Sequence, residues 1–186
     1  MPSDTVDRLT DAALLSVRRH GYAGTSMQDL LRDAGVSSSS LYHFFRGGKE
    51  ELVATAVRRS GLASAEEIAT VMADHEPVDA VARIFDAAAA EMEGHDFALG
   101  CPIGVPATET PADSEAIRDA VDDVFRAWTE AYSAGLRRAG VGADEADRLG
   151  RFIVTAYEGS VTLARATRST QPYRDAATIV AGLLAD

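Results

Sequence analysis

Residues 25–52 read TSMQDLLRDAGVSSSSLYHFFRGGKEEL, and this stretch decides the fold class. Residues 25–28, Thr-Ser-Met-Gln, match a capping box, in which a hydroxyl accepts a hydrogen bond from an early amide and Gln28 reaches back. Apolar residues then recur on one helical face and stop at Gly35, where a left-handed residue typically ends a helix. These face residues are Met27, Leu30, Leu31 and Ala34.

A second short helix follows at once. Ser37 is a good N-cap, Leu41 and Phe44 have the spacing of inward-facing residues, and Val36 is placed to anchor the turn. A further helix is predicted to begin near Lys49. Two helices joined by so tight a turn predict a helix-turn-helix, whose second helix enters a DNA major groove.

The outward residues of that second helix can all form hydrogen bonds, and none is a carboxylate: Ser38, Ser39, Ser40, Tyr42 and His43. Within residues 37–49 the charged side chains are Arg46 and Lys49, so the segment is locally cationic. A lysine at a helix start is unfavourable unless an anion faces it. We therefore expect Lys49 to contact a DNA phosphate, the alternative being a solvated lysine.

Five short motifs in register resemble the N-terminal pattern of the TetR repressor family. They are Gly21-Tyr22, Thr25-Ser26, Ala34-Gly35-Val36-Ser37, Leu41-Tyr42-His43-Phe44 and Lys49-Glu50-Glu51-Leu52. The usual family pattern has one residue fewer before the lysine, where this chain has Phe45-Arg46-Gly47-Gly48-Lys49. This variant and the later Gly100-Cys101-Pro102-Ile103-Gly104 resemble the LmrA/YxaF-like branch.

The resemblance covers roughly the first 60 residues and implies a ligand-binding, dimeric DNA-binding regulator. We expect a three-helix DNA-binding domain over residues 1–48 and a helical ligand-binding and dimerisation domain over residues 49–186. The expected DNA-contacting residues are Thr25, Ser26, Ser37, Ser38, Ser39, Ser40, Tyr42, His43 and Lys49.

The rest of the chain has helical apolar periodicity and no convincing strand, so the predicted fold is all-α. An opening helix is expected over residues 4–20, ended by Gly21, with Val6, Leu9, Ala13 and Val17 inward. A later helix from Pro77 to Gly94 has a continuous apolar stripe. Prolines and glycines make residues 97–111 irregular. Helices are then expected over residues 114–140, from about residue 144, and from Pro172 onward.

The two long helices that flank Gly140 have apolar stripes wider than one neighbour requires. Small residues on the second of them permit close approach of backbones: Ala156, Gly159, Ser160 and Ala164. We expect these helices to pair about a two-fold axis in a homodimer. The alternative is that they only fill the core of one monomer.

Aromatic and apolar residues between these segments are candidates for the wall of a small-molecule site: Phe85, Met92, Phe97, Cys101, Phe125, Trp128, Tyr132 and Tyr157. Aromatic walls with a few polar groups are typical of ligand pockets. For any single residue of this set, ordinary core is the competing interpretation. The resemblance implies that this domain binds an inducer.

Charge is distributed unevenly along the chain, whose formal net charge is −11. Residues 1–52 carry six cationic and seven anionic side chains, so the acidity lies mainly in the later part. Affinity for DNA depends on the cations that meet phosphates, so the total does not exclude it. One cysteine, no signal-like segment and no membrane-length apolar run predict a soluble cytoplasmic protein.

No pattern indicates an enzyme, a cofactor or a metal. The four histidines are scattered, the serine run has no positioned base, and Glu91, Glu93, His95 and Cys101 form at most a weak metal candidate. We expect a repressor that binds palindromic double-stranded operator DNA and is released by a small hydrophobic or aromatic effector. The alternative is a helical interaction protein with a degenerate helix-turn-helix.

Overall fold

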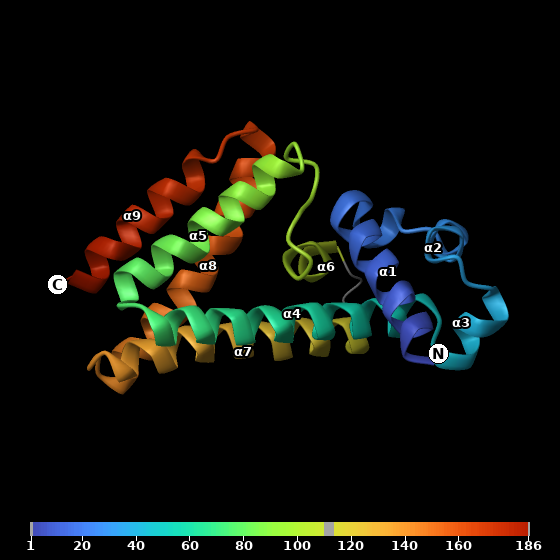
Figure 1. Ribbon diagram of the computed structural model, residues 1–186, viewed down its shortest axis with the longest axis horizontal. Coiled ribbons are helices and arrows are strands. Elements are labelled where there is room, and N and C mark those ends of the chain that lie inside the picture. The colour runs from blue at the N-terminus through green and yellow to red at the C-terminus, as the bar shows by residue number, and fades with distance from the viewer. Residues whose placement is uncertain (1, 110–113, 186) are drawn as a thin grey trace. The chain divides into compact units, whose positions relative to one another are not determined.

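The computed structural model describes residues 2–109 and 114–185 and contains helices and connecting turns, without a strand among these residues (Figure 1). The all-α prediction is confirmed. The helices are α1 (Pro2–Gly24), α2 (Met27–Ala34), α3 (Ser38–Phe44), α4 (Lys49–Asp74), α5 (Pro77–Gly94), α6 (Gly104–Glu109), α7 (Glu115–Arg138), α8 (Ala143–Thr167) and α9 (Gln171–Ala185).

The chain forms two compact units, and each unit is discontinuous. The first unit comprises residues 1–61 and 101–124, and the second comprises residues 62–100 and 125–186. Helices α4 and α7 contribute residues to both units. The units therefore differ from a division at residues 48 and 49, because the start of α4, α6 and the start of α7 join the first three helices.

In the first unit, α1 supplies the predicted apolar stripe. Leu9, Ala13 and Val17 are buried, and Leu30 and Leu41 are buried with them. Gly61 of α4 closely approaches α7, since a Cβ built on it would lie 2.3 Å from Cγ1 of Val124. The first unit is thus closed by a tight helix contact at this glycine.

Helix α1 continues to Gly24, past the end predicted at Gly21, but its geometry breaks at Gly21, where φ is 76° and ψ is 172°. After this break, the Tyr22 amide donates a hydrogen bond to the Glu109 carboxylate of α6 at 3.0 Å. A Cβ on Gly21 would lie 1.9 Å from Oε2 of Glu109. Glycine therefore provides both the left-handed backbone and the space for the carboxylate.

In the second unit, α9 packs against α5 and α8 (Figure 1). The predicted stripe of α5 is buried at Val81, Phe85, Ala88 and Met92. Helices α7 and α8 interlock, because the Ser133 hydroxyl donates to the Ala146 carbonyl at 3.1 Å. Their separation is set at Gly150, where an added Cβ would lie 2.3 Å from Oγ of Ser133 and 2.9 Å from the carbonyl oxygen of Thr129.

The helices that expose apolar side chains differ from those expected to form the dimer. The apolar stripe of α7 is buried at Trp128, Tyr132 and Leu136, so α7 does not offer the surface that the sequence suggested. Two of the small residues predicted to face a partner are also buried in the monomer, because Ser160 donates to Ala156 and Pro172 carbonyls and Ala164 is fully covered.

Four of the exposed large apolar side chains lie on α8 and α9, two helices that pack against each other. Their exposed fractions are 43% for Phe152, 56% for Leu163, 61% for Ile179 and 48% for Leu183. We call these residues the α8–α9 apolar face. Isolated exposed apolar residues are common on monomers, but a set on two adjacent helices is typical of an interaction surface. No helix within residues 2–109 and 114–185 is long and apolar enough to cross a membrane.

Candidate functional site

Helix α2 begins and ends through local hydrogen bonds. Ser26 is the N-cap, and its hydroxyl accepts from the Asp29 amide at 3.4 Å. Gly35 ends the helix in the left-handed region with φ of 61° and ψ of 39°, as its position predicted. The Gly35 and Val36 amides donate to the Arg32 and Leu31 carbonyls, which satisfies the end of the helix.

The capping-box prediction is wrong in register. Because Ser26 is the cap, Asp29 and not Gln28 occupies the third helical position. The side chain of Thr25 is only 3% exposed, and its hydroxyl donates to the Gly21 carbonyl at 2.7 Å. Thr25 thus joins the end of α1 to the start of α2, and its side chain is buried there instead of lying on the surface.

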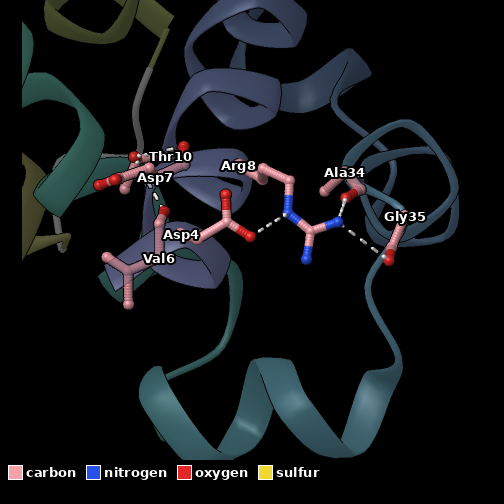
Figure 2. A network of polar contacts seen from close by, with 7 residues as sticks. All are labelled: Asp4, Val6, Asp7, Arg8, Thr10, Ala34 and Gly35. Atoms are coloured by element: carbon pink, nitrogen blue, oxygen red, sulfur yellow. Dashed lines mark hydrogen bonds and ion pairs between the residues drawn. The ribbon is translucent and has the colours of Figure 1, made fainter. Parts of the chain in front are cut away.

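Helix α1 fixes the end of α2 through Arg8 (Figure 2). Nη1 of Arg8 donates to the Ala34 carbonyl at 3.1 Å and to the Gly35 carbonyl at 3.5 Å. Nε of Arg8 also pairs with Asp4 at 3.4 Å, one helical turn earlier. The guanidinium therefore meets the last carbonyls of α2, where the helix dipole favours a positive charge.

Replacing Arg8 by alanine is expected to lower the free energy of unfolding by about 0.5–1.5 kcal/mol, because α2 loses a charged cap. Chemical denaturation monitored by circular dichroism measures the change. Arg19→Ala is the matched control, since Arg19 is an exposed cation of α1 without a polar contact among the described residues. Equal midpoints for both variants would contradict the capping role.

Helix α3 starts at the predicted cap. The Ser37 hydroxyl accepts from the Ser40 amide at 3.2 Å, and Leu41 is fully buried. The second inward residue was predicted one position early: Phe44 is half-buried, whereas Phe45, just past the helix, is 4% exposed. The chain leaves the helical conformation at Phe45, where φ is −127°, and this change of direction places the Phe45 side chain in the core.

The outer face of α3 presents hydroxyls, a phenol and an imidazole. Ser38, Ser39, Tyr42 and His43 are exposed, with 54% exposure for Tyr42, and Ser40 is half-buried. Oγ of Ser37 lies 3.0 Å from that of Ser39 and 2.9 Å from that of Ser40, so these hydroxyls orient one another. We call this surface, with the exposed Arg46, the α3 face. It contains no carboxylate.

Lys49 at the start of α4 is held by the aromatic ring of Tyr22, which was not predicted as a site residue. Its ammonium lies 4.4 Å from the centroid of the Tyr22 ring, a cation–π contact. Burial lowers the pKa of Lys49, while burial and then the nearby Glu50 raise the pKa of Tyr22. The Tyr22 ring thus positions a half-buried cation beside the α3 face, and the Gly-Tyr pair after α1 was the available sequence signal.

The second unit brings several of the predicted pocket residues together around Tyr157. Its ring centroid lies 5.7 Å from that of Phe85 and 5.9 Å from that of Trp128, and Phe125 lies 5.9 Å from Trp128. Tyr173 of α9 was not selected from sequence and lies 6.2 Å from Tyr157. These edge-on contacts define one cluster from four helices, the ring cluster, consisting of Phe85, Phe125, Trp128, Tyr157 and Tyr173.

The other predicted pocket residues are placed differently. Met92 is buried two turns along α5 from Phe85. Phe97 lies under the guanidinium of Arg168, which is 5.7 Å from its ring centroid and pairs with Asp96 at 2.5 Å. Cys101 belongs to the first unit, where its sulfur accepts from the Ile103 amide at 3.4 Å. Tyr132 is buried on α7, and burial raises its pKa.

Within the residues that the structure describes, no group of three or more His, Cys, Asp or Glu side chains is arranged to hold a metal ion. Glu91, Glu93 and His95 belong to the second unit and Cys101 to the first. These four side chains therefore do not form a metal site in the described part of the chain.

Two family models match the chain. Residues 9–56 match the model of bacterial regulatory proteins of the tetR family, and residues 77–179, more than half of the chain, match the C-terminal domain of LmrA/YxaF-like transcriptional regulators. The chain therefore belongs to the TetR family, in its LmrA/YxaF-like branch. This agrees with the resemblance found in the first 52 residues and in residues 100–104.

Individual relatives agree with this classification. The chain is 29% identical over 170 residues to the HTH-type transcriptional regulator YxaF of Bacillus subtilis, covering 91% of this chain and 89% of YxaF. It is 25% identical over 182 residues to LmrA of the same organism, covering 97% of each. The matched families and relatives are transcriptional regulators, not enzymes, as expected.

A solved structure with the same fold contains DNA. A cysteine mutant of the TetR family regulator CifR, complexed with 26bp double-strand operator DNA, aligns with a TM-score of 0.76 and 23% identity. The alignment covers 96% of this chain and 94% of CifR. By the two family models, the chain is a TetR-family transcriptional regulator with a DNA-binding helix-turn-helix.

Proposed function

We propose that the protein is a ligand-responsive repressor that binds a palindromic operator as a homodimer and is released by a small hydrophobic or aromatic inducer. The observation that carries the DNA part is the α3 face, an exposed surface of hydrogen-bonding and cationic groups without a carboxylate. The complex of CifR with operator DNA, on the same fold, supports this assignment by analogy.

The proposed DNA-contacting residues are those of the predicted set without the buried Thr25: Ser26, Ser37, Ser38, Ser39, Ser40, Tyr42, His43 and Lys49. None of the three serines 38–40 can make the bidentate base contacts that arginine or glutamine makes. Sequence discrimination then depends on the serine hydroxyls, bridging water and DNA shape.

The α8–α9 apolar face supports the homodimer. Two copies related by a two-fold axis bury Phe152, Leu163, Ile179 and Leu183 against the same residues of the partner. Such a dimer presents two α3 helices, and a palindrome is read when their spacing matches major grooves about 34–36 Å apart. Because the proposed partner is chromosomal DNA, we also propose that the protein acts in the cytoplasm.

The ring cluster supports the ligand part of the proposal, since several aromatic residues gathered in one unit are typical of small-molecule sites. A ligand that binds the DNA-incompetent arrangement more tightly shifts the population away from DNA, and a difference of about 1.4 kcal/mol is already tenfold. A ligand that binds and leaves operator affinity unchanged would contradict this mechanism.

The function is tested by fluorescence anisotropy of the purified protein with a random operator library and bulk competitor DNA at two salt concentrations. We expect enrichment of a two-fold-symmetric site whose affinity falls at the higher salt, because released counterions oppose binding. No selection over competitor, or a response that does not change with salt, would favour the alternative of a degenerate helix-turn-helix used for protein contacts.

Lys49→Ala and Tyr42→Ala are each expected to weaken binding to all sequences alike, as loss of a backbone contact does. For Lys49→Ala the slope of log affinity against log salt is expected to fall by about one, since one fewer phosphate is neutralised. Titrations of both variants against several operators measure this. Arg83→Ala, which removes an exposed cation of α5, is the control. A loss confined to one operator position would instead indicate a base contact.

A further inference from the structure

Tyr132 has a buried hydroxyl that the fold does not use. Its side chain is 2% exposed, and no residue that the structure describes forms a hydrogen bond with the hydroxyl. Buried polar groups nearly always have a hydrogen-bond partner, so a hydroxyl without one indicates a missing partner. Tyr132 lies one turn along α7 from Trp128 and two turns from Phe125, so it shares the helical face that supplies these two residues to the ring cluster.

The other buried hydroxyls of serine and threonine in the second unit are already engaged. Among the described residues these are Ser133, which donates to Ala146, and Ser160, which donates to Ala156 and Pro172. Each satisfies a backbone carbonyl of its own unit. The Tyr132 hydroxyl differs because it is free to pair with a group from outside the protein.

The interior of the second unit also lacks charge. Among the described residues no Asp, Glu, Lys, Arg or His side chain is buried. Burial raises the pKa of the Tyr132 phenol, so the group stays neutral and keeps its proton. A charged molecule that entered this interior would lose its hydration without gaining a counter-charge, which is strongly unfavourable.

We infer that the effector of the second unit is an uncharged, largely apolar molecule with one hydrogen-bonding group that pairs with the Tyr132 hydroxyl. This inference rests on the proposed ligand-binding function and names the chemistry of that ligand. Tyr132 is then the specificity-determining residue that distinguishes ligands with the polar group from those without it.

The test uses three probes of matched shape on the full-length protein: para-tert-butylphenol, para-tert-butyltoluene and para-tert-butylbenzoate. Isothermal titration calorimetry gives the affinity of each. The wild type is expected to bind the phenol about fivefold more tightly than the toluene, the effect of one net hydrogen bond. The benzoate is expected to bind more weakly than both. In Tyr132→Phe the preference for the phenol is expected to disappear, since only the hydroxyl is removed.

Ser133→Ala is the matched variant, because it deletes the adjacent buried hydroxyl, which has a partner. We expect Ser133→Ala to lower the melting temperature and to keep the preference for the phenol. Tyr132→Phe is expected to leave the melting temperature unchanged or to raise it, because an unpaired buried hydroxyl is removed. A melting temperature lowered as much as in Ser133→Ala would show that Tyr132 already has a partner, such as an enclosed water, and would overturn the inference.

The probe results separate this inference from the proposed function. Equal affinities for the phenol and the toluene, or an unchanged preference in Tyr132→Phe, would overturn the role of Tyr132 while leaving a ligand site in place. If the benzoate bound most tightly, the inference that the ligand is uncharged would be wrong, although a ligand site would still exist. If no probe binds at its solubility limit, the inference fails, whereas operator selection still decides the DNA-binding function.

Discussion

Leu163→Glu is expected to convert the protein to monomers and to weaken operator binding by about 10³-fold or more, the lower end of the usual gap between specific and non-specific binding. Leu163 is 56% exposed at the α8–α9 apolar face. In the proposed dimer a carboxylate at this position would be buried in an apolar contact, where charge is poorly solvated. Each recognition helix would then bind a half-site alone.

Sedimentation and operator titration of the same samples measure the two effects. The matched control is Leu62→Glu, because Leu62 is also an exposed leucine, at 44%, but lies on α4. We expect the control to remain dimeric and to bind the operator like the wild type. A Leu163→Glu variant that stays dimeric would show that another surface forms the dimer.

Gly61→Ala is expected to lower the free energy of unfolding by about 1–3 kcal/mol, the usual effect of overpacking. An added Cβ would lie 2.3, 2.4 and 2.9 Å from Cγ1, Cγ2 and Cβ of Val124. Because all three side-chain atoms of a stiff β-branched residue are too close, no rotamer of Val124 relieves the contact. The higher helix propensity of alanine offsets only about 0.5–1 kcal/mol.

A double-mutant cycle tests the cause of this effect. Val124→Ala removes the atoms that the new methyl would meet, so Gly61→Ala is expected to be much less harmful in the Val124→Ala background. Urea unfolding of the four proteins gives the coupling free energy, expected to be about 1–3 kcal/mol and favourable. Additive effects would show that Gly61 is required for a reason other than its contact with Val124.

The sequence predicted the helix-turn-helix well because its determinants are local. Ser26 and Ser37 cap helices through amides three residues away, and Gly35 ends α2 through its own backbone conformation. Such preferences act over one helical turn and can be read without knowing the rest of the fold. The start of α4 at Lys49 was also predicted correctly from local residues.

Errors in the prediction arise where the chain turns between helices and where helices pack against one another. Thr25 is buried because the end of α1 turns back on it, and Phe45 replaces Phe44 in the core because the chain turns after α3. The apolar stripe of α7 is buried within the monomer, and four exposed large apolar side chains lie on α8 and α9 instead. Apolar periodicity shows that a face will be covered, but it does not show by which helix.

The ring cluster was predicted in composition but not in arrangement. Periodicity indicated the helices that carry Phe85, Trp128 and Tyr157, and the structure brings these rings into contact. Tyr173 joins them only because α9 packs against α5 and α8. Whether Tyr132 has a hydrogen-bond partner depends on every neighbouring helix, and sequence spacing contains no such information.

The discontinuity of the first unit has a consequence for synthesis of the chain on the ribosome. Residues 1–61 emerge first, but Glu109, which accepts from the Tyr22 amide, emerges much later, and the unit closes only after Val124. Contacts so distant in sequence slow folding, because a long segment must be ordered before they form. A prematurely terminated chain that ends before Cys101 would lack this carboxylate and the α8–α9 apolar face. Such fragments are therefore not expected to occupy operators in competition with the full-length protein.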